Sequence, residues 1–254
     1  MKKFWGFLLV IVLMTSCGEY QSLLKSNDYN LVYKKAIEYY NKGDYQRAMN
    51  LLDGVRSVFV GQAKAQNIAY YRAFCSYNMK DYQIASDLFK QFIQTYPESS
   101  FAEECLYMMG FCDYKASPKP RLDQQVTEKA IREFQLYLSR YPYSMRKDKV
   151  NTYMDEMRDK LSYKAYLSAK NYYLREHYKA AVISLQNCLK DYPGSKYREE
   201  IMYMLFVSKY QMAVNSVEDK KVERYNNARE EYYYFADEYP NSRYAADVKK
   251  MYED

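Results

Sequence analysis

The stretch Tyr82–Ser99, YQIASDLFKQFIQTYPES, decides the fold, because its pattern recurs along the chain in a fixed frame. In each copy an alanine stands twelve residues before a proline, a tyrosine precedes that proline, and a serine follows it two residues later. The copies start at Ala85, Ala130, Ala181 and Ala228. Residues at +4, +7 and +11 from the alanine are mostly aromatic or apolar, which predicts one face of a helix that ends at Tyr-Pro.

A degenerate fifth copy starts at Ala48, with Val60 in place of the proline. Just before it, Ala36, Tyr39, Gly43 and Tyr45 have the spacing of the tetratricopeptide pattern. A single repeat of this kind cannot bury its own apolar face, so several copies predict a stack. We therefore expect an all-α tetratricopeptide-repeat solenoid of about five helix-turn-helix repeats, followed by a C-terminal capping helix from Arg243 to Tyr252.

Three departures from the plain repeat stand out. Ser117–Val126 and Asn215–Lys221 lengthen the spacing inside two repeats, and each predicts an inserted loop. Arg146–Arg175 contains no Pro or Gly and predicts an unusually long first helix in the fourth repeat. Because stacking alone does not require these features, we expect them to be surfaces for a protein partner, with tolerated surface variation as the alternative.

An aromatic face is predicted on the first helix of the first three repeats, where an aromatic or apolar residue recurs at i, i+4 and i+7. Its members are Tyr33, Ile37, Tyr40, Tyr70, Phe74, Tyr77, Tyr107, Phe111 and Tyr114. Tyrosine combines a large apolar body with a polar tip, which suits binding to extended peptide segments. We expect a peptide-binding groove; the alternative is that these rings pack on the neighbouring repeat.

The N-terminus reads MKKFWGFLLVIVLMTSC, with Lys2 and Lys3, an apolar run and two small residues before Cys17. The apolar run is too short to span a bilayer, so residues 1–16 are expected to be a signal peptide. The small residues before the cysteine resemble a lipobox. This resemblance implies that Cys17 carries acyl chains that anchor the protein in a lipid bilayer and that residues 17–28 form a lipidated polar tether. The repeat pattern then predicts that five tetratricopeptide-like repeats fill residues 29–254.

Chemistry-bearing motifs are absent from the sequence. The single histidine, His177, is expected in a solvated helix–helix turn, and no Cys/His spacing fits a metal. No phosphate-binding or nucleophile motif is present. The formal net charge is +6, and the Lys and Arg residues are interspersed with Asp and Glu rather than clustered, which does not indicate nucleic-acid binding. We expect a protein that is not an enzyme, has no cofactor or metal, and keeps its other four cysteines as buried thiols.

A lipid-bearing cysteine, a short tether and five repeats ending in Tyr-Pro-x-Ser resemble the BamD family of lipoproteins. That resemblance implies a scaffold anchored at the periplasmic face of the outer membrane within the outer-membrane protein assembly (BAM) complex. It implies binding to a BamA-like barrel subunit and to unfolded outer-membrane proteins, which are inserted into the membrane. The alternatives are a periplasmic adaptor of the Tol-Pal coordinator type and a SusD-like nutrient-binding lipoprotein.

Overall fold

The computed structural model of the protein describes residues 18–253, so the expected signal peptide and Cys17 lie outside the described residues. The chain divides into two compact units, and each is described by itself. The N-terminal unit contains the described residues up to Pro118 together with Gln125–Met154. The C-terminal unit contains Lys119–Gln124 and the chain from Asp155 onward.

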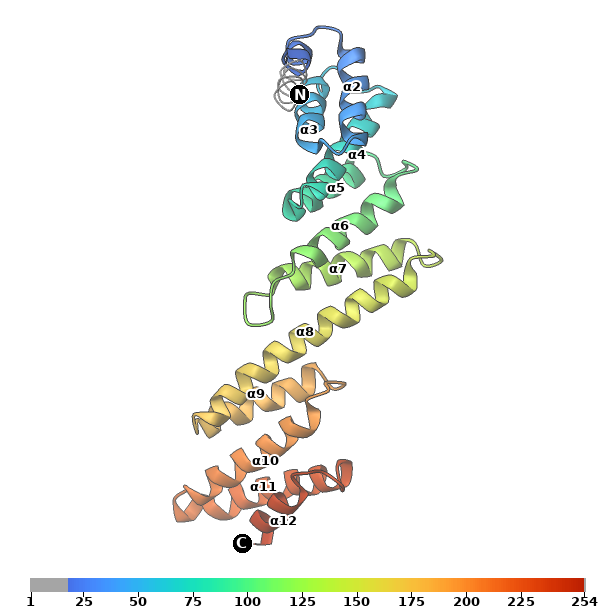
Figure 1. The fold of residues 1–254 in the computed structure, drawn as a ribbon. Helices are drawn as coiled ribbons and strands as arrows, with labels where there is room; N and C mark the ends of the chain where they lie inside the picture. The colour runs from blue at the N-terminus through green and yellow to red at the C-terminus, as the bar shows by residue number, and fades with distance from the viewer. Residues whose placement is uncertain (1–17, 254) are drawn as a thin grey trace, which may run out of the picture. The chain divides into compact units, whose positions relative to one another are not determined.

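The N-terminal unit consists of helical hairpins. Its helices are α2 (Tyr29–Asn41), α3 (Tyr45–Val55), α4 (Ala63–Asn78), α5 (Tyr82–Thr95), α6 (Ala102–Ala116), α7 (Gln125–Arg140) and the first turns of α8 (Lys147–Leu174). From α2 to α7 each helix packs on the next one, and the succession of pairs can be followed in Figure 1. These pairs are the first three predicted repeats.

The C-terminal unit continues the same plan. After the remainder of α8 it contains α9 (Tyr178–Asp191), α10 (Arg198–Val214), α11 (Glu218–Glu238) and α12 (Ala245–Glu253). The predicted all-α tetratricopeptide solenoid is thereby confirmed, as are the capping helix, α12, and the long first helix of the fourth repeat, which runs for 28 residues in α8.

The repeated motif places the core. The frame alanines Ala85, Ala130, Ala181 and Ala228 are all buried, and so are the +4 and +7 residues of the first three of these copies. The small alanine lets two helices approach closely, and the larger residues fill the space on either side. The tyrosine before each proline ends its helix: at Tyr96 the backbone leaves the helical region, with φ −129° and ψ 60°.

The serine of each Tyr-Pro-x-Ser motif ties successive repeats together. Its hydroxyl accepts a hydrogen bond from the backbone N–H two residues later, at the start of the next helix, as in Ser144 with Arg146 (3.2 Å). A second hydrogen bond joins the same hydroxyl to a side chain on the first helix of the preceding hairpin. The pairs are Ser99 with Gln66 (2.8 Å), Ser144 with Glu103 (2.7 Å), Ser195 with Ser162 (2.8 Å) and Ser242 with Glu199 (2.6 Å).

The turn inside a repeat requires a left-handed residue. Gly43 fills it in the first repeat with φ +81°, while Lys80 (φ 68°) and Glu176 (φ 58°) fill it in the second and fourth. Glycine adopts this conformation without steric cost, whereas the other two residues are strained. The second repeat therefore makes the same turn at Lys80 that the sequence pattern assigns to Gly43 in the first.

Two segments differ from expectation. The polar tether is helical over residues 18–24, and its Tyr20 and Leu23 are buried against the first repeat. The Tyr20 hydroxyl accepts a hydrogen bond from Asn50 (3.1 Å), so this segment is packed onto the fold and is not a free linker. The expected loop at Asn215–Lys221 is also mostly helical, because α11 already begins at Glu218.

Candidate peptide-binding groove

Helices α2, α4 and α6 carry the nine residues predicted to line a groove, since i, i+4 and i+7 lie on one helical face. Eight of the nine are half-buried, neither enclosed in the core nor fully in solvent. The exception is Tyr107, whose exposed fraction is 8%. The helical face predicted from sequence therefore exists, but Tyr107 belongs to the interior.

The aromatic side chains form an unbroken series of ring contacts, which we call the aromatic ladder. Its rings are Tyr40, Tyr70, Tyr71, Phe74, Tyr77, Tyr107, Phe111, Tyr114 and Tyr153. The contact that links α4 to α6 joins Tyr77 to Phe111, with ring centroids 6.2 Å apart. Tyr33 lies apart from this series and contacts Phe59 instead, at 6.1 Å.

Tyr153 of α8 is the ladder residue that sequence reasoning missed. Its ring lies 4.5 Å from Tyr114 and 5.4 Å from Phe111, centroid to centroid. The insertion before α7 shifts the spacing between repeats, so Tyr153 does not continue the 37-residue interval of the earlier triplets. The one sequence signal that could have indicated Tyr153 was its position, a tyrosine about two turns into the long predicted helix Arg146–Arg175.

The ladder rings also contribute to the core through their inner edges. Phe74 packs on the buried Phe89 (5.0 Å), and Tyr107 packs on the buried Tyr137 (5.9 Å). Such contacts fix ring positions, because each ring is held between its own helix and the second helix of its repeat. The half-buried rings consequently present a preorganised edge, which is the property that a tolerant peptide site needs.

Several tyrosine hydroxyls of the ladder have a pKa above the ordinary value of the group. Burial raises the pKa of Tyr40 to about 12. Burial and the hydrogen bond to Glu104 raise the pKa of Tyr70, whose hydroxyl donates to that carboxylate at 2.8 Å. The same bond recurs in the C-terminal unit between Tyr166 and Glu200 (2.9 Å).

These bonds give the Glu103-Glu104 and Glu199-Glu200 pairs a common structural explanation. In each pair the first carboxylate accepts from the serine of the following Tyr-Pro-x-Ser motif, and the second accepts from a tyrosine of the preceding first helix. The Tyr70 hydroxyl therefore already donates its proton to Glu104. A bound peptide would contact the Tyr70 ring, and it could use the Tyr70 hydroxyl oxygen only as a hydrogen-bond acceptor.

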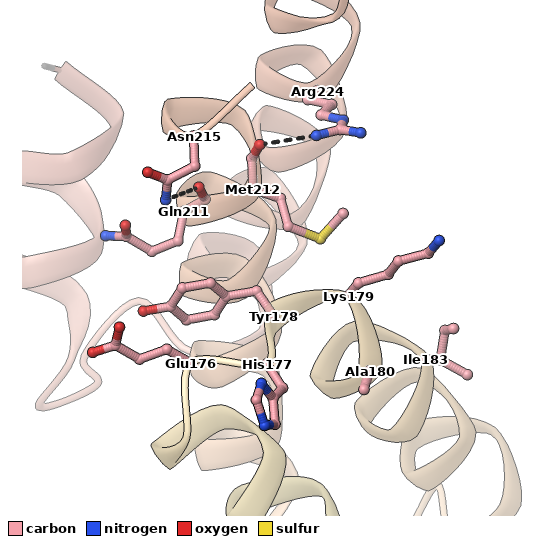
Figure 2. Close-up of a pocket in the computed structure, with 10 residues that line it drawn as sticks. All are labelled: Glu176, His177, Tyr178, Lys179, Ala180, Ile183, Gln211, Met212, Asn215 and Arg224. Atoms are coloured by element: carbon pink, nitrogen blue, oxygen red, sulfur yellow. Dashed lines mark hydrogen bonds between the residues drawn. The ribbon is translucent and has the colours of Figure 1, made fainter. Parts of the chain in front are cut away.

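A second feature is an open hollow of ≈ 620 Å³ in the C-terminal unit. Figure 2 shows its lining, which comes from the α8–α9 turn, the first turns of α9, the end of α10, and α11, and includes His177, Met212 and Arg224. His177 is exposed in the turn before α9, as predicted. Arg224 donates to the backbone oxygen of Met212 (3.3 Å), so that cation supports the α10–α11 connection.

A buried polar cluster lies between α5, α6 and α7. Ser86 donates to Asp113 (3.0 Å), and the Lys129 ammonium lies 2.9 Å from Asp113 and 3.7 Å from Glu133. Glu133 is 8% exposed. Burial, with Asp113 facing it, raises the pKa of Glu133 to about 8. Lys129 thus serves the two buried carboxyls as well as the exposed Asp87 (3.8 Å), and the proton on Glu133 removes excess negative charge near neutral pH.

The described cysteines are inert. Cys75, Cys105, Cys112 and Cys188 are buried, and each is a free thiol. Burial raises the pKa of Cys75 and of Cys105 to about 12, so neither forms a nucleophilic thiolate at neutral pH. Within residues 18–253 no group of three or more His, Cys, Asp or Glu side chains is placed to hold a metal ion.

Stacked hairpins with a half-buried aromatic face define a tetratricopeptide scaffold of the kind that binds other proteins. A family model described as YfiO, outer membrane lipoprotein, matches residues 25–200 and 165–254. Together these matches cover most of the chain, which belongs to this family.

Two solved structures with a similar arrangement are distant in sequence. A TPR repeats protein (BF2334) from Bacteroides fragilis is 12% identical, with a TM-score of 0.43, and the match covers 90% of this chain and 97% of that one. The TPR2AB domain of yeast Sti1, in a complex with pHSP90, is 14% identical with a TM-score of 0.40, covering 89% and 97%. A search of curated proteins returned no match.

The family is one of outer-membrane lipoproteins. Across the described part of the chain, no helix combines the length and apolar character needed to cross a bilayer.

Proposed function

We propose that this protein is a lipid-anchored scaffold of the BAM complex, attached through Cys17 to the periplasmic face of the outer membrane. It binds a BamA-like barrel subunit and receives unfolded segments of outer-membrane proteins before their insertion. The family match over residues 25–254 supports the location at the outer membrane and the class of lipoprotein scaffold. The proposed role is protein interaction, with no catalytic step.

The aromatic ladder of the N-terminal unit carries the receiving role. Its rings form one contiguous series from Tyr40 to Tyr153, and most of them keep an edge in solvent. Rings fixed in this way contact an extended chain with little loss of side-chain entropy. Because ring contacts tolerate many sequences, the site suits a carrier that must accept different unfolded clients.

The test is binding of aromatic-rich extended peptides to the full chain, measured by fluorescence anisotropy. Tyr114→Ala removes a half-buried ladder ring that contacts Phe111 and Tyr153, and we expect it to weaken binding several-fold. Tyr143→Ala is the matched control, since Tyr143 lies in the same unit but is 98% exposed in the α7–α8 turn.

Thermal midpoints separate a binding role from a packing role. Weaker binding of Tyr114→Ala with a midpoint close to that of Tyr143→Ala supports a groove. A destabilisation of about 3 kcal/mol, typical of truncating a buried aromatic residue, would assign Tyr114 to the core. Equal peptide affinity in the two variants would remove the ladder as the binding site.

A further inference from the structure

Cationic side chains lie over rings of the aromatic ladder and over Tyr33. In the N-terminal unit the charged groups stand 4.8 Å from the Tyr107 ring centroid (Arg146), 5.3 Å from Phe111 (Lys115), 5.7 Å from Tyr33 (Lys64) and 5.9 Å from Tyr153 (Lys149). At these distances a cation is attracted to the face of an aromatic ring. The aromatic surface therefore has a positive border.

The carboxylate of Glu104 also bonds to a ladder residue, Tyr70, and it is already paired with Arg146 at 3.8 Å. Lys115 and Lys149, by contrast, are exposed and belong to α6 and α8, on either side of the cluster of Phe111, Tyr114 and Tyr153. Two lysines thus flank the α8 end of the ladder with their charges open to a ligand.

We infer that the aromatic ladder selects extended segments in which acidic residues accompany the aromatic ones. A ligand carboxylate beside a bound ring would meet Lys115 or Lys149, which the ladder rings already hold in place. A ligand lysine at that point would meet like charge. This inference rests on the proposed function of the ladder, and it adds a charge preference that ring contacts alone would not produce.

The experiment uses three peptides of equal length that share alternating phenylalanines and differ only at the intervening positions, which are all Asp, all Ser or all Lys. We expect the full chain to bind the Asp peptide about tenfold more tightly than the Lys peptide, with the Ser peptide between them. The preference should shrink as salt is raised, because the lysines are exposed.

Two sets of variants identify the source of the preference. Lys115→Gln combined with Lys149→Gln should reduce the Asp-to-Lys ratio to near one. Lys147→Gln is the control: Lys147 is also exposed on α8, but two residues from Lys149 and so on a different helical face. Far-UV circular dichroism checks that each variant is folded.

The outcomes distinguish this inference from the proposed function. Equal binding of all three peptides to the wild type, or a preference that persists in the double variant, would overturn the charge selection and leave the groove intact. Binding of none of the peptides would overturn both.

Discussion

Gly110 of α6 gives the most direct test of how closely the helices of a repeat approach. A Cβ atom at this position would stand 2.8, 3.0 and 3.3 Å from three ring carbons of Phe134 on α7. The ring cannot swing away, because Phe134 is fully buried and packs against Tyr107 and Tyr153.

Two effects of Gly110→Ala compete. Alanine in a helix interior is favoured over glycine by about 1 kcal/mol, whereas overpacking a rigid core costs about 1–3 kcal/mol. Because the contact falls on a ring and not on a flexible chain end, overpacking wins. We expect a net loss of about 1 kcal/mol, which corresponds to a fall of about 2–4 °C in Tm for a domain of this size. Urea denaturation followed by circular dichroism measures it.

Gly54→Ala is the matched control. Gly54 also lies in a helix of the N-terminal unit, α3, but a Cβ there would meet nothing within 4 Å. It should stabilise the protein by about 0.4–1 kcal/mol, chiefly by restricting the unfolded chain. If Gly110→Ala were stabilising by the same amount, α6 and α7 would not approach as closely as described, and the argument would be wrong.

The other predictions address the anchor, the partner surface, the serine contacts and the buried carboxyl. Cys17→Ala should abolish incorporation of labelled fatty acid and release the protein from outer-membrane fractions; continued labelling would refute the lipoprotein reading. Reversing the exposed charges of Lys119 and Arg121 should reduce recovery of the barrel subunit in pull-downs, and unchanged recovery would leave that loop as ordinary surface. Ser144→Ala removes a bond to Glu103 and a cap on α8, so it should cost about 1–2 kcal/mol in denaturation experiments, with Ser100→Ala, an exposed serine in the equivalent earlier turn, near zero. Because the pKa of Glu133 is raised to about 8, its protonated form contributes stability that is complete below the pKa of the unfolded state and is lost as pH rises through about 8. Glu133→Gln should therefore flatten the decline in Tm between about pH 5 and 9. Parallel curves of Tm against pH for the wild type and the variant would show that Glu133 does not titrate there.

The helices were predictable because their signals are local. The buried alanine, the apolar face and the Tyr-Pro stop all lie within one helix, so counting residues was enough to place α5, α7, α9 and most of α11. The long α8 was predictable for the same reason, since nothing in Arg146–Arg175 interrupts a helix.

The remaining features depend on contacts between helices. The sequence contains the pairs Glu103-Glu104 and Glu199-Glu200, but it does not show that each carboxylate accepts a hydrogen bond from a distant serine or tyrosine. Residues 18–28 look like a polar tether because most of their side chains are polar, yet Tyr20 and Leu23 pack the segment on the first repeat, while Leu24 stays exposed. Tyr107 was expected to line the groove, but it is buried, because its ring packs on Tyr137 and Phe134 of the next helix.

The repeat motif and the candidate groove are physically connected through the start of α8. Ser144 bonds to Glu103 of α6 and caps the backbone at Arg146, which fixes where α8 begins beside α6. Tyr153 follows two turns later, and its contact with Tyr114 depends on that placement. A motif whose immediate role is to stack hairpins therefore also positions the ring at the end of the ladder. Changes to the Tyr-Pro-x-Ser turn should consequently alter peptide binding as well as stability, although the turn itself lies outside the ladder.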